Sequence, residues 1–79
     1  MTTETATHFG NWLRRQIEDR EFSIAAFARH AGIPLRSVQR WLAEPCPGIR
    51  GHFRTRLARS LGVERDVIDG QLDAASAAA

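Results

Sequence analysis

The 79 residues of this chain allow one domain and exclude a large effector or catalytic domain. The composition, 43% hydrophobic and 25% charged, is that of an ordinary globular protein rather than a disordered one. The formal net charge is +2, but residues 14–61 hold ten arginines against four acidic residues, a net of +6, and the remaining residues carry −4. We therefore expect the middle of the chain to attract a polyanion and the C-terminal part to be repelled by one.

The N-terminal segment, residues 1–6, has neither the basic start nor the apolar stretch of a signal peptide, and we expect it to be disordered. No run in the chain approaches membrane-spanning length, so no membrane partner and a cytoplasmic location are expected. Cys46 is the single cysteine, which excludes an internal disulfide and a zinc site built on paired cysteines. The three histidines lack metal-ligand spacing, and neither a metal nor a cofactor is expected.

The first two predicted helices lie before Gly32. The first runs from about Thr7 to Asp19, because its apolar residues recur at helical spacing on one side. Ser23 has the hydroxyl of a natural N-cap, and it predicts a second helix that ends at Gly32. The apolar residues of the first helix are Phe9, Trp12, Leu13 and Ile17.

The third predicted helix begins near Pro34, where the missing N–H of proline is harmless in the first turn. It stops at Glu44, because Pro45 disfavours helical geometry in the residue before it. The small Ala28 allows two helices to cross closely, and Gly32 supplies the flexible turn residue between them. Residues 24–43 are therefore predicted to form a helix-turn-helix.

Two more helices complete an all-α fold. A fourth amphipathic helix is predicted to end at Gly62, and a short fifth helix begins at about Glu64. Residues 74–79 have good helix propensity but nothing to pack against, and we expect a frayed tail there. The folded domain is then residues 7–73, a compact domain of five helices. The apolar residues of the fourth helix are Phe53, Leu57 and Leu61.

The third helix has two chemically different faces. At 100° per residue its apolar side chains cluster together, and Arg36 and Arg40 point almost directly away from them. Arginine can pair with the two guanine acceptors of the major groove, Gln39 with adenine, and Ser37 with bases or phosphates. The alternative is a polar face that only meets water, but the preceding helix and turn favour nucleic-acid readout. The apolar cluster is Val38, Trp41 and Leu42, with Leu35 at its edge.

The residues of the predicted helix-turn-helix and of the two helices after it resemble a known family. SIAAFARHAGI followed by PLRSVQRWL looks like the DNA-binding domain of the lambda-repressor and Cro type, and LARSLGVERDVI is similar to the family's end of helix four and start of helix five. The resemblance covers Trp12 to Leu72 and implies a lambda-repressor-like domain from a prokaryote or phage, associated with the nucleoid. It also implies base contacts from the start of the third helix and one turn later, which fall on Leu35, Arg36, Gln39 and Arg40.

The sequence departs from the family pattern in two places. Ile24 stands where the family often has a glutamine that contacts phosphate, so backbone N–H groups near Ser23 to Ala25 would have to replace that contact. Pro34 and Leu35 stand where the family often has Ser and Gln, and Leu35 either touches a thymine methyl or completes the core. The expected backbone contacts are Ser23, Ile24, Ser37, Arg50 and His52, although Arg50 and His52 could equally be solvated surface residues.

Together these features predict a sequence-specific double-stranded DNA-binding transcriptional regulator, most simply a repressor, with no catalytic constellation and hence no enzymatic activity. One short recognition helix reads few base pairs, so we expect a homodimer on a pseudo-palindromic operator. The expected dimer interface is on the fifth helix, through Val67, Ile68 and Leu72. The alternative is an antitoxin-like or adaptor protein that binds a protein partner through the same apolar end and the acidic tail.

Overall fold

The computed structural model describes residues 8–45 and 47–78, and within these ranges the chain forms five helices and no strand. The helices are α2 (His8–Asp19), α3 (Ile24–Ala31), α4 (Leu35–Ala43), α5 (Gly51–Leu61) and α6 (Arg65–Ala78). The Cα radius of gyration is 11.5 Å, close to the value of about 11.6 Å for a compact chain of this length. The prediction of a compact all-α domain with five helices is confirmed. Residues 1–6, predicted to be disordered, lie outside the described residues.

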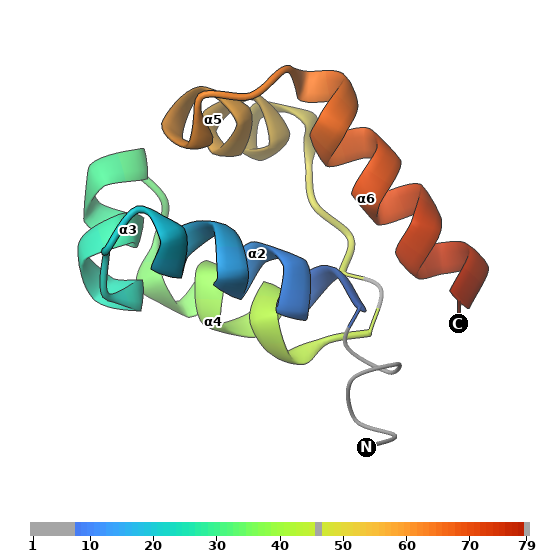
Figure 1. The fold of residues 1–79 in the computed structure, drawn as a ribbon, viewed down its shortest axis with the longest axis horizontal. Helices are drawn as coiled ribbons and strands as arrows, with labels where there is room; N and C mark the ends of the chain where they lie inside the picture. Colours follow the sequence, from blue (N-terminus) through green and yellow to red (C-terminus); the bar gives the residue numbers. More distant parts are fainter. Residues whose placement is uncertain (1–7, 46, 79) are drawn as a thin grey trace.

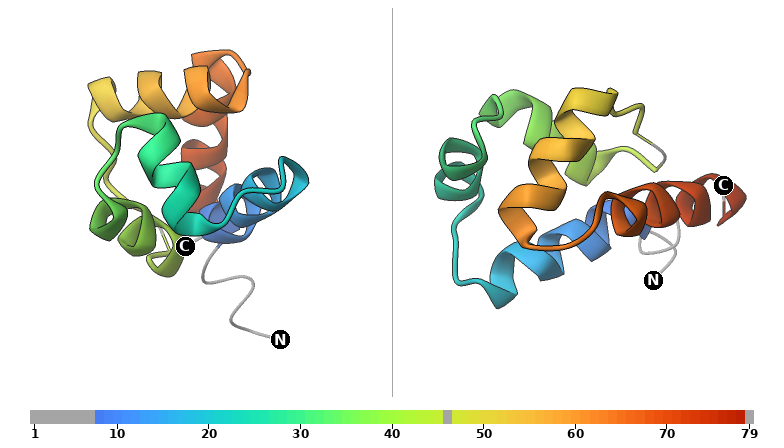
Figure 2. Two further views of the ribbon diagram at one scale, coloured as in Figure 1. Left: turned by 90° about the vertical axis from the view of Figure 1, so that its left-hand side faces the viewer. Right: turned by 90° about the horizontal axis from the view of Figure 1, so that it is seen from above.

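The five helices form a closed ring of packing contacts. Helix α2 packs against α4 and α6, α3 packs against α4 and α5, and α5 packs against α6 (Figure 1). The two views in Figure 2 show that α4 and α6 lie on different sides of α2. Every helix therefore buries one face against two neighbours, and the surface that each helix leaves outside is available for binding.

The helix ends are determined by local capping. The Ser23 hydroxyl accepts a hydrogen bond of 3.1 Å from the Ala26 N–H at the start of α3. Gly32 and Gly62 both have φ of 71°, in the left-handed region where glycine is favoured. After Gly32, the N–H of Ile33 donates to the Ala28 carbonyl at 2.9 Å, which is the bond of a Schellman motif. These caps confirm the predicted ends of α3 and α5.

A single apolar core lies inside the ring. Each fully buried apolar side chain contributes about 1.5–3 kcal/mol to the stability of the fold by leaving water. Trp12, predicted on the apolar side of the first helix, is half-buried and packs against the edge of this core. The largest fully buried side chains are Trp41, Phe9, Phe27, Leu13, Ile17, Leu57, Ile68 and Val38.

Helices α2 and α4 approach each other closely at Gly10. A Cβ atom at this position would overlap the Leu42 carbonyl oxygen, and it would lie 2.8 Å from the Leu42 carbonyl carbon. These are backbone atoms, which cannot rotate out of the way as a side chain can. The absence of a side chain at Gly10 therefore sets how near α4 lies to α2.

The C-terminal residues correct the expectation of a frayed tail from residue 74. Helix α6 continues to Ala78, and Ala75 is 2% exposed. The physical reason is that α6 packs along α2, so Ala75 extends the buried face already formed by Ile68 and Leu72. The stretch does have a packing partner, which lies about 60 residues earlier in the chain.

Candidate nucleic-acid interface

The outer face of α4 carries the residues that the sequence predicts to read bases. Arg36, Gln39 and Arg40, called here the outer row, are all exposed, and Ser37 beside them is half-buried. Leu35 is 40% exposed, so it does not complete the core and lies next to the outer row. The opposite face of α4 holds the buried residues Val38, Trp41 and Leu42.

The connection between α3 and α4 is held by a side chain from α5. Arg56 donates a hydrogen bond of 2.6 Å from Nη1 to the carbonyl oxygen of Gly32, and its guanidinium lies 5.9 Å from the centre of the Phe53 ring. A charged donor to a carbonyl is among the stronger hydrogen bonds. The contact joins residues 24 positions apart, and no local sequence pattern predicts it. Arg56 therefore helps to hold the angle between α3 and α4.

The eleven arginines divide into three structural groups. Four hold parts of the fold together: Arg54 donates to the Ile49 carbonyl at 2.8 Å and to Asp69 at 2.9 Å, and Arg20, Arg56 and Arg65 make similar contacts. Arg40 has only a surface pair with Glu44 at 3.9 Å, which contributes little to stability. The other six make no hydrogen bond or ion pair to any described residue. They are Arg14, Arg15, Arg29, Arg36, Arg50 and Arg59.

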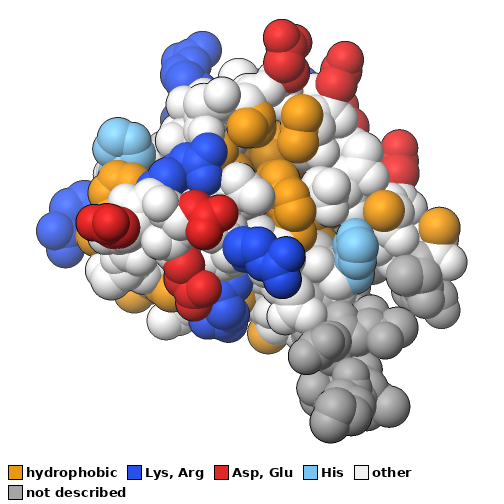
Figure 3. Space-filling view, in the orientation of Figure 1, with side chains coloured by type: hydrophobic (Ala, Val, Ile, Leu, Met, Phe, Trp, Pro, Cys, Tyr) orange, Lys and Arg blue, Asp and Glu red, His pale blue; other side chains and the backbone are white. Residues whose placement is uncertain are grey.

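Acidic side chains lie on two parts of the described surface: Glu64, Asp66, Asp69 and Asp73 on α6 and the turn before it, and Glu18, Asp19, Glu21 and Glu44 near the ends of α2 and α4. Figure 3 shows acidic side chains at the upper edge of the molecule and down the side where α6 lies, and both signs of charge over α2. Asp69 on α6 binds Arg54 at 2.9 Å and Arg65 at 3.7 Å. Two of the arginines are thus neutralised on the α6 side, whereas the outer row keeps Arg36 without a partner among the described residues.

Four of the five residues predicted to contact the DNA backbone are at the starts of α3 and α5, and the fifth, Ser37, is on α4 beside the outer row. Ser23 caps α3, and the Ile24 side chain packs against the core, so only the backbone N–H of Ile24 could meet a phosphate. Arg50 and His52 are exposed at the start of α5. The Phe53 ring lies 5.5 Å from the Trp41 ring of α4, which places the first turn of α5 beside α4. The structure therefore brings Arg50 and His52 to the neighbourhood of α4.

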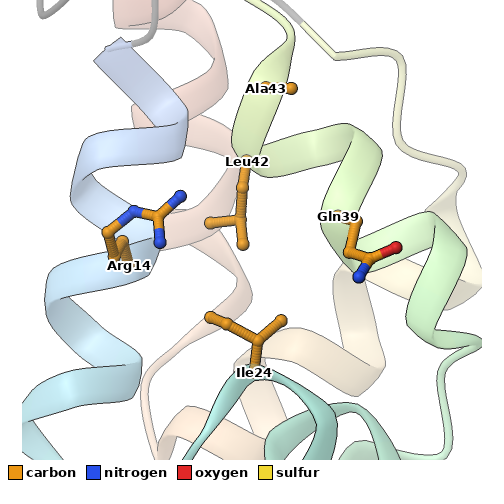
Figure 4. A pocket seen from close by; sticks show the side chains of 5 residues that line it. All are labelled: Arg14, Ile24, Gln39, Leu42 and Ala43. Atoms are coloured by element: carbon orange, nitrogen blue, oxygen red, sulfur yellow. The ribbon is translucent and has the colours of Figure 1, made fainter.

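A hollow of about 240 Å³ opens between α2, α3 and α4 (Figure 4). Arg14 comes from α2 and Gln39 from α4, and the two lie on opposite sides of the hollow. Ile24, Leu42 and Ala43 form its apolar lining. We call it the Arg14 hollow. It was not predicted from the sequence, because Arg14 lies 25 residues before Gln39 and no spacing rule relates the two.

The predicted dimer interface is corrected by the burial of two of its three residues. Ile68 is 0% exposed and Leu72 is 5% exposed, whereas Val67 is 39% exposed. The reason is that α6 packs against both α2 and α5, which uses the apolar face of α6 within one chain. Only Val67 of the three could touch another molecule. The same burial removes most of the apolar surface on which the alternative of a protein-binding adaptor depended.

Comparisons of the chain with protein-family models, with curated proteins and with solved structures found no match. The resemblance to the lambda-repressor family accordingly stays a prediction from the residues quoted above. No helix in the described part of the chain is long and apolar enough to cross a membrane. In residues 8–45 and 47–78, no three His, Cys, Asp or Glu side chains are grouped as metal ligands would be.

Proposed function

We propose that this protein is a sequence-specific transcriptional regulator, in which α3 and α4 act as a helix-turn-helix and α4 lies in the major groove of double-stranded DNA. The observation that carries the proposal is the outer row of α4, which is exposed on the side opposite Val38 and Trp41. A major groove about 12 Å wide admits one α-helix with its side chains. The outer face of α4 carries polar groups that match the edges of bases.

The chemistry of the outer row supports direct readout of sequence. A guanidinium without a partner among the described residues, such as that of Arg36, can donate two hydrogen bonds to the O6 and N7 atoms of guanine. The Gln39 amide can donate to and accept from adenine in the same plane. Arg40 would exchange its solvent-exposed pair with Glu44 for a base or a phosphate at little cost.

The outer row also needs a fixed position, because readout depends on side chains that meet the bases in one geometry. Three contacts supply it: the close approach at Gly10, the hydrogen bond from Arg56 to Gly32, and the burial of Trp41. The first sets the distance from α2 to α4, and the second supports the turn before α4. The scaffold is therefore suited to presenting α4 rigidly.

A regulator of this size reads enough sequence only when two copies bind one site. We therefore propose a homodimer on a pseudo-palindromic operator, with half-sites about 34 Å apart or a multiple of that distance. Repression is the simplest mode of action for such a protein, because occupying an operator excludes other proteins from it. With Ile68 and Leu72 in the core, the second copy would have to be held by other surface residues, Val67 among them.

The proposal is tested by selecting a duplex from a random library and measuring its binding by fluorescence anisotropy over a range of salt concentrations. The expected result is tight binding to one palindrome and a linear fall of log K with log salt. Arg36→Ala is expected to reduce the preference for the selected duplex over a scrambled one by roughly 5- to 150-fold, since a bidentate pair to a base contributes about 1–3 kcal/mol of discrimination.

The matched control is Arg59→Ala. Arg59 is also exposed and without a partner among the described residues, but it is on the last turn of α5, beside His30 and Ala31. The Arg59→Ala substitution removes the same charge as Arg36→Ala, and it should leave the preference for the selected duplex unchanged. Failure of the unmodified protein to bind any duplex at low salt would refute the proposal. Equal loss of preference in both variants would refute the role given to the outer row.

A further inference from the structure

The Arg14 hollow adjoins the outer row of α4 but is not explained by base readout. Gln39 belongs to both, since it lines the hollow and also lies in the outer row. A DNA strand that places a base against Gln39 must carry its own backbone past one side of α4. The hollow lies on the α2 side of Gln39 (Figure 4).

The lining of the hollow matches one unit of a DNA backbone. Its lining combines the apolar side chains of Ile24, Leu42 and Ala43 with the guanidinium of Arg14 and the amide of Gln39. Deoxyribose presents mainly C–H groups, and the phosphate attached to it is an anion with several acceptor oxygens. An apolar lining beside a cationic donor is complementary to that combination.

Arg14 is free to take this role. It is exposed, and it makes no hydrogen bond or ion pair to any described residue, unlike the arginines that hold α5 and α6 together. In Figure 4 its guanidinium points from α2 into the hollow. Glu18, one turn further along α2, borders a separate hollow with Arg14 and Arg15 but forms no ion pair within 4 Å of either.

We propose that the Arg14 hollow is a subsite for one sugar-phosphate unit of the DNA strand next to the base that Gln39 meets, with Arg14 as its phosphate-binding side chain. The inference rests on the proposed function. It extends the interface to α2, outside the helix pair to which the sequence assigned the base contacts. The contact would fix the register of α4 along the groove without reading sequence, because every nucleotide carries the same phosphate.

The first experiment compares Arg14→Ala with Arg15→Ala on the selected duplex and on a scrambled duplex. Arg15 is the next residue of α2, it is also exposed and unpaired among the described residues, and it borders the same hollow with Glu18, but it does not line the Arg14 hollow. Arg14→Ala is expected to weaken binding roughly tenfold to both duplexes, as for one lost hydrogen bond to a charged group. It should also make the slope of log K against log salt less steep by about 0.9. Arg14→Lys should recover part of the affinity because it restores the charge.

The second experiment locates the phosphate. Single phosphates of the selected duplex are replaced one at a time by neutral methylphosphonates, and the affinity of each duplex is measured with the unmodified protein and with Arg14→Ala. We expect one position per half-site at which the replacement weakens the unmodified protein but has no effect on Arg14→Ala. Arg15→Ala should remain sensitive at that position. Thermal unfolding of each variant should be unchanged, since neither side chain is buried.

The outcomes separate the subsite from the proposed function. Equal losses for Arg14→Ala and Arg15→Ala would show that α2 acts only through its overall charge and would overturn the subsite. The same conclusion would follow if no methylphosphonate position lost its effect in Arg14→Ala. Absence of DNA binding by the unmodified protein would overturn both proposals. Binding by the unmodified protein with no effect of Arg14→Ala would overturn the subsite alone.

Discussion

Replacing Gly10 by alanine tests whether the approach of α2 to α4 sets the position of the outer row. The added Cβ would overlap the Leu42 carbonyl and lie 3.1 Å from the Leu42 Cα. Forcing one extra carbon into a well-packed contact costs about 1–3 kcal/mol, and backbone atoms on the other side favour the upper part of that range. Alanine regains up to about 1 kcal/mol through its higher helix propensity. The net expectation is a loss of about 1–2 kcal/mol.

The assay is thermal unfolding followed by circular dichroism, with Gly70→Ala as the matched control. For a domain of this size each kcal/mol shifts Tm by about 4–8 °C, so Gly10→Ala should lower Tm by roughly 4–16 °C. Gly70 is also within a helix, α6, but a Cβ there meets nothing within 4 Å. Gly70→Ala should therefore raise stability by up to about 1 kcal/mol.

The same substitution has a functional consequence. If α4 must move away from α2, the outer row shifts relative to the other contacts, and binding of the selected duplex should weaken even at temperatures where Gly10→Ala is fully folded. An increase in Tm for Gly10→Ala, similar to that for Gly70→Ala, would refute the reasoning. It would mean that α2 and α4 separate without cost and that Gly10 does not set their distance.

Other substitutions test the remaining contacts. Ser23→Ala removes the acceptor for the Ala26 N–H and should cost about 1 kcal/mol of stability, measured by urea unfolding; an unchanged midpoint would count against the cap. Arg40→Ala should relax the base preference in competition binding, and equal losses on selected and scrambled duplexes would argue against its place in the outer row. Arg50→Ala should weaken all duplexes alike and reduce the salt slope by about 0.9, whereas a change in base preference would contradict a backbone contact.

The capped helix boundaries, unlike the C-terminal end of α6, were predictable because their causes are local. A serine hydroxyl reaches an N–H three residues away, and a glycine in the left-handed region ends the helix that precedes it. Pro45 also acts locally, because it disfavours helical geometry in the residue before it, and α4 ends at Ala43 with Glu44 as its cap. The two faces of α4 were predictable for a similar reason, since the order of side chains around a helix follows from its 3.6-residue period.

Residues that are distant in the sequence were placed only by the tertiary structure. The sequence shows eleven arginines, but which of them hold the fold and which are free depends on acceptors such as the Gly32 carbonyl and Asp69. The apolar side of the last helix was recognisable, yet whether it faces another molecule or its own core depends on where α2 and α5 lie. Packing placed Ile68 and Leu72 in the core and left Val67 outside.

The sequence by itself therefore determined the existence of the helices, the capped C-terminal ends of α3, α4 and α5 and the polar face of α4, because each depends on interactions within one or two helical turns. The tertiary structure decided the closeness of α2 to α4 at Gly10, the burial of Ala75 and the position of Arg14 beside Gln39. These depend on contacts between segments separated by many residues, and such contacts are specified by the packing of the whole core rather than by any local pattern.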